Sequence, residues 1–393
     1  MKKALAIFPL ATMVLMPSAF AVEIYKDDKN SIGIGGYIDA RIIDTQGQTQ
    51  VVNGSSRVNI GFTREMSDDW KAFTKLEWGV NPFGDTSLSY SSESFFETTT
   101  DNFLSNRLGY VGVSHDKLGS LAIGKQWGAW YDVVYNTNYG FVWDGNASGT
   151  YTYQGDGSFN GTGRADKAVQ YRNSFGMFSF ALQVQLKDDS FDVIEPVDQA
   201  AAMVTAPTTV THVEYNYTYG AGLTLDATDR LTFTAGANFG EFKARASNGS
   251  RLTETDYVYG GGVTWGAWDD QGFYAALNAN QQEYHDTDNL GRMIPDATGL
   301  ESLFSYLFEG DFKVFLSYNI LKAGDEYEAA YNGDIFERES LVAGGHYIWN
   351  NSVIFYLEGR KDLSNFDSTN KAQEELMGKP EDDGVAIGVR FII

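Results

Sequence analysis

Few side chains in this sequence are arranged to do covalent chemistry. The 393 residues contain no cysteine, which excludes a disulfide framework, a thiolate metal site and a cysteine nucleophile. The four histidines, His115, His212, His285 and His346, lie far apart, and none stands beside a recognisable nucleophile motif. Zinc binding by imidazoles and Ser–His catalysis are therefore not expected. We expect neither an enzyme nor a bound metal or cofactor.

Charged side chains are the remaining candidates for function. Lys and Arg number 29, Asp and Glu number 52, and the formal net charge is −23. Recognition of phosphate backbones needs an excess of positive charge, so the composition argues against a nucleic-acid partner. Charged side chains act on small solutes only where a fold holds them along a path, and the sequence pattern indicates which fold that is.

The first 21 residues are typical of a targeting signal. Lys2 and Lys3 precede an apolar run, and Pro17-Ser18-Ala19-Phe20-Ala21 supplies a helix break and a small-residue cleavage site. The alternative is an N-terminal membrane anchor. It is disfavoured because the apolar run is shorter than the roughly 20 residues that span a bilayer. We predict a signal peptide at 1–21 and a single domain at 22–393.

The rest of the chain alternates apolar and polar residues with a period of two. Ser31–Ile43, Phe178–Leu186, Leu231–Phe239, Phe312–Ile320 and Val385–Ile393 all follow this pattern. Such alternation over about ten residues is typical of strands with one apolar and one polar face. No stretch of comparable length has a helical period, so we predict an all-β fold.

Short polar turns alternate along the chain with longer Gly-rich and acidic loops, which implies sixteen strands and predicts an antiparallel transmembrane β-barrel. Closure satisfies the backbone groups that an open sheet edge would leave unpaired in lipid. A secreted β-sandwich or propeller is the alternative, but no blade-like repeat is present. Aromatic residues near strand ends fit an interfacial girdle: Trp70, Trp78, Tyr110, Tyr257, Trp265, Tyr347 and Trp349.

Four segments resemble the general diffusion porins of Gram-negative bacteria. They are Val22–Gly36, Arg107–Asp132, Gly163–Ser174 and Asp382–Phe391, which together extend over the domain. The resemblance implies a homotrimer of sixteen-stranded barrels in the outer membrane, surrounded by lipid and lipopolysaccharide. It also implies a third loop, about residues 127–163, that folds inward and narrows a water-filled channel for small hydrophilic solutes and ions.

The resemblance further implies a constriction with basic residues on the barrel wall. Arg107 and Arg164 match two of the family's wall arginines. Arg41 and Arg57 have lumen-facing parity but are displaced from the family positions, and Lys125 stands near the start of the third loop. We expect these five residues to be the basic side of the constriction.

Carboxylates on the third loop are the expected acidic side. The family's usual Pro-Glu-Phe-Gly-Gly is absent, and Phe141-Val142-Trp143-Asp144-Gly145 replaces it. We predict Asp144 as the main constriction carboxylate, Asp132 as an anchor of the loop, and Asp156 as a further acidic group. A turn residue before Gly145 is the alternative role for Asp144.

The third loop is also rich in aromatic residues, which resembles the oligosaccharide-selective porins called chitoporins. Pyranose rings stack on aromatic planes, so Trp127, Trp130, Phe141 and Trp143 are candidate sugar-stacking residues. Packing of the loop against the wall is the alternative for each ring. Oligosaccharides are thus a second expected class of solute.

The acidic surplus falls mainly in the predicted loops, including Asp188-Asp189, Asp286, Asp288, Asp325-Glu326 and Glu381-Asp382-Asp383. Acidic residues at a channel mouth attract cations within a Debye length of about 8 Å. We therefore predict a modest cation preference that weakens as salt rises. An outer-membrane barrel enzyme and an adhesin or phage receptor remain the alternatives of other classes.

Overall fold

The computed structural model describes residues 22–393 except 46, 84–86, 92–93, 99–102, 154, 187–188, 196–208, 247–248 and 379–381. The predicted signal peptide at 1–21 lies outside the described residues, as do Asp188 and Glu381 of the acidic loops. Among the described residues, no helix has the length and apolar character needed to cross a bilayer.

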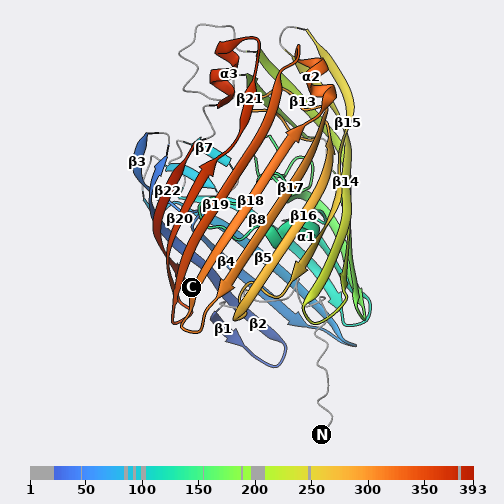
Figure 1. The fold of residues 1–393 in the computed structure, drawn as a ribbon. Helices are drawn as coiled ribbons and strands as arrows, with labels where there is room; N and C mark the ends of the chain where they lie inside the picture. The colour runs from blue at the N-terminus through green and yellow to red at the C-terminus, as the bar shows by residue number, and fades with distance from the viewer. Residues whose placement is uncertain are drawn as a thin grey trace.

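The fold is almost entirely antiparallel sheet (Figure 1). Its first strands are β1 (Val22–Lys26), β2 (Asn30–Thr45), β3 (Gln48–Asn53), β4 (Arg57–Glu65), β5 (Trp70–Val80), β6 (Ser87–Ser91), β7 (Ser94–Thr98), β8 (Leu104–His115), β9 (Gly119–Trp127), β10 (Arg164–Phe175) and β11 (Phe178–Gln185). The remaining strands are β12 (Asp189–Glu195), β13 (Thr209–Asp226), β14 (Leu231–Ala246), β15 (Arg251–Trp265), β16 (Gly272–Glu283), β17 (Asp296–Leu307), β18 (Phe312–Ala323), β19 (Ile335–Trp349), β20 (Val353–Asp362), β21 (Asn365–Asp367) and β22 (Gly384–Ile392).

The sheet closes on itself because β22 pairs with β2, with Phe391 opposite Ile38 and Ile387 opposite Ile42. Four positions around the barrel are each shared by two short strands. β3 and β4 both pair with β2, β11 and β12 with β13, β20 and β21 with β19, and β1 continues the position of β22 beside β2. The result is a closed antiparallel barrel of 16 strands, which confirms the predicted fold class.

The period of two in the sequence explains the two faces of the barrel. On β11, Leu182 is 51% exposed to the exterior, whereas Gln183 beside it is 5% exposed and faces inward. Apolar side chains also cover the outside of the other strands, as a lipid-facing surface requires. Trp265 and Trp349 are exposed girdle residues as predicted. Tyr110 instead faces inward, where its ring lies 6.3 Å from that of buried Phe73.

The two ends of the barrel differ. At one end the strands join through tight turns, and Asn350 and Asn351 both have φ near +55°, as a two-residue hairpin turn requires. At the other end the connections are long and carry two short helices, α2 (Asp325–Ala330) and α3 (Lys371–Gly378) (Figure 1). Leu290, Tyr327, Phe336 and Met377 form a shared core that packs these connections together over the barrel.

Candidate functional site

The connection between β9 and β10 lies inside the barrel. Residues 128–163 contain the short helix α1 (Tyr131–Val134) and a 3₁₀ turn at Tyr135–Thr137, and Figure 1 shows α1 at mid-height within the ring of strands. We refer to residues 128–163 as the inner loop. Its backbone bonds to inward-facing side chains of the wall, and buried carboxylates make the strongest of these contacts.

Glu358 on β20 holds the tip of the inner loop. This carboxylate is fully buried and accepts hydrogen bonds from the backbone N–H of Phe141 at 2.8 Å and of Val142 at 2.9 Å. Nε2 of His346 on β19 lies 2.9 Å from the same carboxylate. The tip is thereby fixed against the β19–β20 part of the wall.

Glu301 on β17 holds the middle of the inner loop in the same way. It is 1% exposed and accepts from the backbone N–H of Ala147 at 2.9 Å and of Ser148 at 2.8 Å. The hydroxyl of Thr137 donates to its second oxygen at 2.6 Å. The backbone donors of a non-helical segment, which water would satisfy on a surface, are satisfied here by one wall carboxylate.

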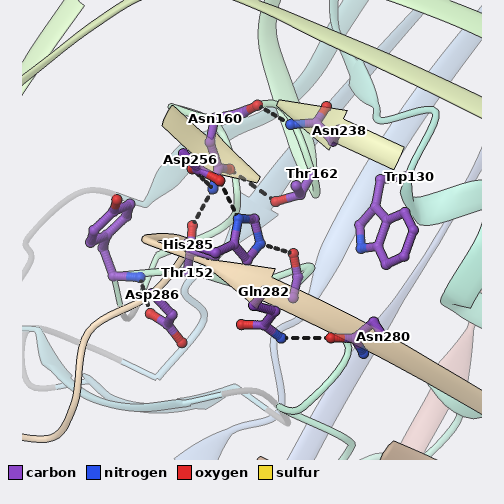
Figure 2. Close-up of polar contacts among 12 residues, drawn as sticks. Trp130, Thr152, Asn160, Thr162, Asn238, Asp256, Asn280, Gln282, His285 and Asp286 are labelled. Carbon is purple, nitrogen blue, oxygen red and sulfur yellow. Dashed lines mark hydrogen bonds and ion pairs between the residues drawn. The ribbon is translucent and has the colours of Figure 1, made fainter. Parts of the chain in front are cut away.

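A third anchor surrounds His285, just beyond β16 (Figure 2). Asp256 on β15 is completely buried, contacts Nδ1 of His285, and accepts from the amide of Asn160 at 3.1 Å. Nε2 of His285 lies 2.7 Å from the carbonyl oxygen of Gly149, so both ring nitrogens face acceptors. Burial lowers the pKa of His285, but the Asp256 carboxylate outweighs it, and the net pKa is raised above the ordinary value of 6.5.

The basic side chains predicted for the constriction fall into two groups. The first group lies on β8–β10, away from the β15–β20 strands that carry the three anchors. It consists of Arg107 on β8, Lys125 on β9 and Arg164 on β10. Arg107 pairs with Glu77 of β5 at 2.9 Å. Arg164 and Lys125 both pair with Asp156 of the inner loop, at 3.2 and 3.0 Å.

Arg57 and Arg41 belong to different surroundings. Arg57, at the start of β4, is half-buried, donates to the carbonyl oxygen of Ser55 at 3.2 Å and lies 4.7 Å from the centre of the Tyr37 ring. Arg41 is only 2% exposed and pairs with buried Asp39 at 3.3 Å. Its charge is thus directed at the β2–β22 seam and not at a solute, which corrects the expectation for Arg41.

The loop carboxylates also separate by environment. Asp156 faces Lys125 and Arg164; burial raises its pKa, but these two positive charges outweigh burial and hold the pKa well below its ordinary value. Asp132 on α1 pairs with Arg172 of β10 at 2.9 Å. Asp144 is 8% exposed and accepts from the N–H of Gly145 at 3.0 Å. This geometry fits the turn alternative for Asp144, so Asp156 is the loop carboxylate that meets the basic wall.

The four rings proposed to stack on sugars already have partners in the protein. Trp130 is fully buried, with its indole N–H bonded to the carbonyl of Ser148 at 2.9 Å, and Trp143 is 8% exposed. Trp127 stacks on Tyr131 at 4.0 Å between ring centres, with the Arg164 guanidinium 5.5 Å from its centre.

Phe141 stacks on the His346 ring at 4.3 Å, and the Arg390 guanidinium lies 3.5 Å from its centre. The structure thus favours the packing alternative for all four rings. Trp130 and Trp143 are buried, and this corrects their assignment as solute contacts.

Sequence reasoning missed the wall residues that hold the inner loop and those that pair with the arginines. Glu301, Glu358, Asp256 and Glu77 have inward parity on their strands, and that parity was the signal available. Lys75 of β5, two residues from Glu77 on the same face, was also missed. Among the described residues, no group of three or more metal-ligating side chains is arranged to hold a metal ion.

Comparison with known proteins gives a consistent family and fold. A family model described as Gram-negative porin matches residues 10–366. The chain is 27% identical to outer membrane porin F of Xenorhabdus nematophila over 192 residues, an alignment that spans 47% of each protein. It is 22% identical to outer membrane protein S2 of Salmonella typhi over the whole of both chains.

Solved structures of low sequence identity share the fold. A Salmonella typhi OmpF structure in complex with daunomycin superposes with a TM-score of 0.68 at 19% identity, covering 95% of this chain and all of that one. The trimer form of OmpT from Vibrio cholerae superposes with a TM-score of 0.59 at 16% identity, covering 93% of this chain and all of OmpT. At these identities the likeness bears on the barrel architecture alone.

Proposed function

The chain belongs to the Gram-negative porin family and is an outer-membrane β-barrel, and on that premise we propose that it forms a water-filled channel for passive diffusion of small hydrophilic solutes and ions. The family assignment also makes it a channel protein and not an enzyme.

One observation carries the proposal. The hydrogen bonds of the inner loop run to the part of the wall from β10 and β11 round to β14–β17, and to β20. The contacts of Arg57, Glu77 and Arg107 instead remain within β2, β4, β5 and β8 and the turn at Ser55. A solute path along this second side would pass charged wall groups on one hand and the inner loop with Asp156 on the other, and such opposed charges select by size and charge.

We place the predicted cation preference at the mouth. Asp325, Glu326 and Glu328 of α2 are exposed at the long-loop end of the barrel. Asp286 and Asp288, which the sequence assigned to the same acidic surplus, are buried and interact with Arg338 and Arg292. The preference therefore depends on fewer carboxylates than the sequence suggested, and we expect it to be small and sensitive to salt.

The oligosaccharide-selective alternative has less support than the diffusion channel. It relied on rings that the structure packs against protein groups, and no described contact favours a sugar over another polar solute. Assembly as a homotrimer in contact with lipid and lipopolysaccharide is part of the proposal. It is supported by the similarity to the trimer form of OmpT.

Single-channel recording in planar bilayers tests the proposed function. We expect stepwise conductance that closes in three equal levels for a trimer, a reversal potential that favours cations at low salt, and no transient block by chito-oligosaccharides or maltodextrins. Block by one sugar class would favour the oligosaccharide channel. Absence of any current from correctly folded protein would contradict the proposal.

A further inference from the structure

The short turn between β15 and β16, residues 266–271, differs from the other short turns of the barrel. In those turns every residue is exposed, at 27–29, 66–69, 116–118, 176–177, 227–230, 308–311 and 350–352. Trp268 of the β15–β16 turn is instead only 9% exposed, and it belongs to a buried cluster with Val142 and Trp143 of the inner loop. A side chain from the short-turn end therefore reaches the inner loop inside the barrel.

Two glycines give this turn a backbone that other residues would strain. Gly266 and Gly272 have φ of +82° and +106°, in the region that favours glycine. A Cβ on Gly266 would lie 2.7 Å from the carbonyl oxygen of Phe273, and the backbone N–H of Gly266 donates to the carbonyl oxygen of Arg230 at 2.8 Å. These backbone features do not involve the indole, so we expect the turn to keep its course when Trp268 is replaced.

The Trp268 ring packs against the tip of the inner loop. It lies nearly parallel to the ring of Tyr139, at an angle of 6° and with the ring centres 4.8 Å apart. Tyr274 of β16 meets both rings edge-on, at 5.9 Å from Tyr139 and 5.7 Å from Trp268. The Tyr274 hydroxyl also donates to the carbonyl oxygen of Asn136 at 2.6 Å. Residues 136–139 are thus held from the short-turn end of the barrel.

A buried cation fastens the turn to the wall. Lys313 on β18 is 1% exposed, and its Nζ lies 3.9 Å from the centre of the Trp268 ring, as in a cation–π contact. The same Nζ lies 3.3 Å from Oδ1 of Asp269, whose side chain is 81% exposed. A buried ammonium that loses its carboxylate partner is costly, so the ion pair strengthens the hold on the turn.

From these contacts we propose that Trp268 is a positioning residue of the channel: from the short-turn end it holds the ring of Tyr139 at the place that sets the size limit for solutes. The inference rests on the proposed channel function and adds a determinant of solute size to it. Trp268 is covered, whereas Tyr139 is half-buried and its uncovered part borders the lumen. Glu301 and Glu358 hold the backbone of the inner loop, and Trp268 holds a side chain that a solute can meet.

The test is the exclusion of polyethylene glycols of graded size from single channels. Polymers small enough to enter lower the conductance, and polymers that are excluded leave it unchanged. In Trp268→Ala the Tyr139 ring can move back into the volume that the indole leaves, so we expect the channel to admit polymers that wild type excludes. Trp268→Phe keeps a ring at this place and should restore the wild-type cut-off.

A double variant shows whether Trp268 acts through Tyr139. Tyr139→Ala removes the ring that borders the lumen and should raise the cut-off by itself. Adding Trp268→Ala to Tyr139→Ala should then raise the cut-off no further, because side chains that act as one unit do not have additive effects. Additive increases would contradict the positioning role. A purely structural role would lower thermal stability without this dependence of the cut-off on Tyr139.

Two matched controls separate the contact from general effects of substitution. Trp265→Ala removes the same residue type from the end of β15, but Trp265 is 43% exposed on the outside of the barrel, so the cut-off should not change. Asp269→Asn removes the partner of Lys313 and should raise the cut-off, though less than Trp268→Ala does. Asp270→Asn removes an equal charge from the next exposed residue and should leave the cut-off unchanged.

The outcomes are distinct. Equal cut-offs in wild type, Trp268→Ala and Asp269→Asn, or an equal increase in Trp265→Ala or Asp270→Asn, would overturn the role of Trp268 while leaving the channel intact. Absence of current from wild-type protein would instead overturn the channel function on which the inference rests. The pair Asp269→Asn and Asp270→Asn provides the decision if Trp268→Ala fails to assemble, because both side chains are exposed.

Discussion

The two halves of the barrel interior use the same types of side chain for different ends. On the β14–β20 half, Glu301, Glu358 and Asp256 are buried and accept hydrogen bonds from the inner loop. On the β4–β8 half, Glu77 pairs with Arg107 and also interacts electrostatically with Arg57 and Lys75, so this carboxylate faces wall cations and not the inner loop. The difference shows that inward parity alone does not define a pore residue. A wall side chain that the inner loop covers holds the loop, whereas one that the loop leaves uncovered can meet the solute.

Removing an anchor carboxylate should have the largest effect. Glu301→Ala leaves the backbone N–H groups of Ala147 and Ser148 buried without their acceptor. We expect a loss of about 3 kcal/mol from the free energy that holds the loop in place, together with noisy, enlarged conductance. Thermal unfolding and single-channel noise would measure both effects. Glu77→Ala is the comparison from the other half, and it should alter ion selectivity with little change in noise.

A change of pH should have the second-largest effect, and it should act on the half of the barrel interior that holds the inner loop. Because the pKa of His285 is raised, its protonated form is the one that the folded state prefers, and the anchor is fully formed below the unfolded value. The stabilisation should be lost as pH rises from about 6.5 through the higher folded pKa, since neutral His285 cannot donate to both Asp256 and Gly149. Channel noise recorded from about pH 6 to pH 9 should therefore rise in wild type. A flat wild-type profile, or the same rise in His285→Gln, would contradict this role.

Substitution of the two loop carboxylates, Asp156 and Asp144, should give the smallest of the three effects, a difference in ion selectivity. Asp156→Asn removes one carboxylate partner of Lys125 and Arg164 and should shift the reversal potential toward anions, by about twofold in the permeability ratio. Asp144→Asn removes a buried turn carboxylate and should shift the ratio by much less. A larger shift from Asp144→Asn would return Asp144 to the constriction and contradict the turn assignment.

The barrel was predictable because its physical cause is local. Alternation along β11 and β22 places apolar side chains outward whatever lies elsewhere in the chain, and short turns fix the order of neighbouring strands. Tyr110 shows where this reasoning fails. The strand register shifts between Glu77 and Trp78, where β5 pairs with β8, and such a bulge changes which residues face inward.

The site was only partly predictable because its contacts are non-local. Glu301 and Ala147 are 154 residues apart, and no local pattern shows that the inner loop will cover that part of the wall. Arg107 and Arg164 were identified by resemblance to the family, but Arg41 has the same parity and lies buried at the seam. Lys75 carries no motif.

The central claim is that solutes pass along the β4–β8 half and not along the β14–β20 half. The chain has no native cysteine, so a single introduced thiol reports its own accessibility. Gly61 lies on β4, where an added Cβ would have open space. Asn278 lies on β16, is 3% exposed, and donates its amide to the Thr137 hydroxyl of the inner loop at 2.6 Å. We would record from Gly61→Cys and Asn278→Cys channels while adding a charged, water-soluble thiol reagent. Rapid loss of current in Gly61→Cys, with no change at Asn278→Cys, is the predicted result. Rapid modification of Asn278→Cys with Gly61→Cys unaffected would contradict it.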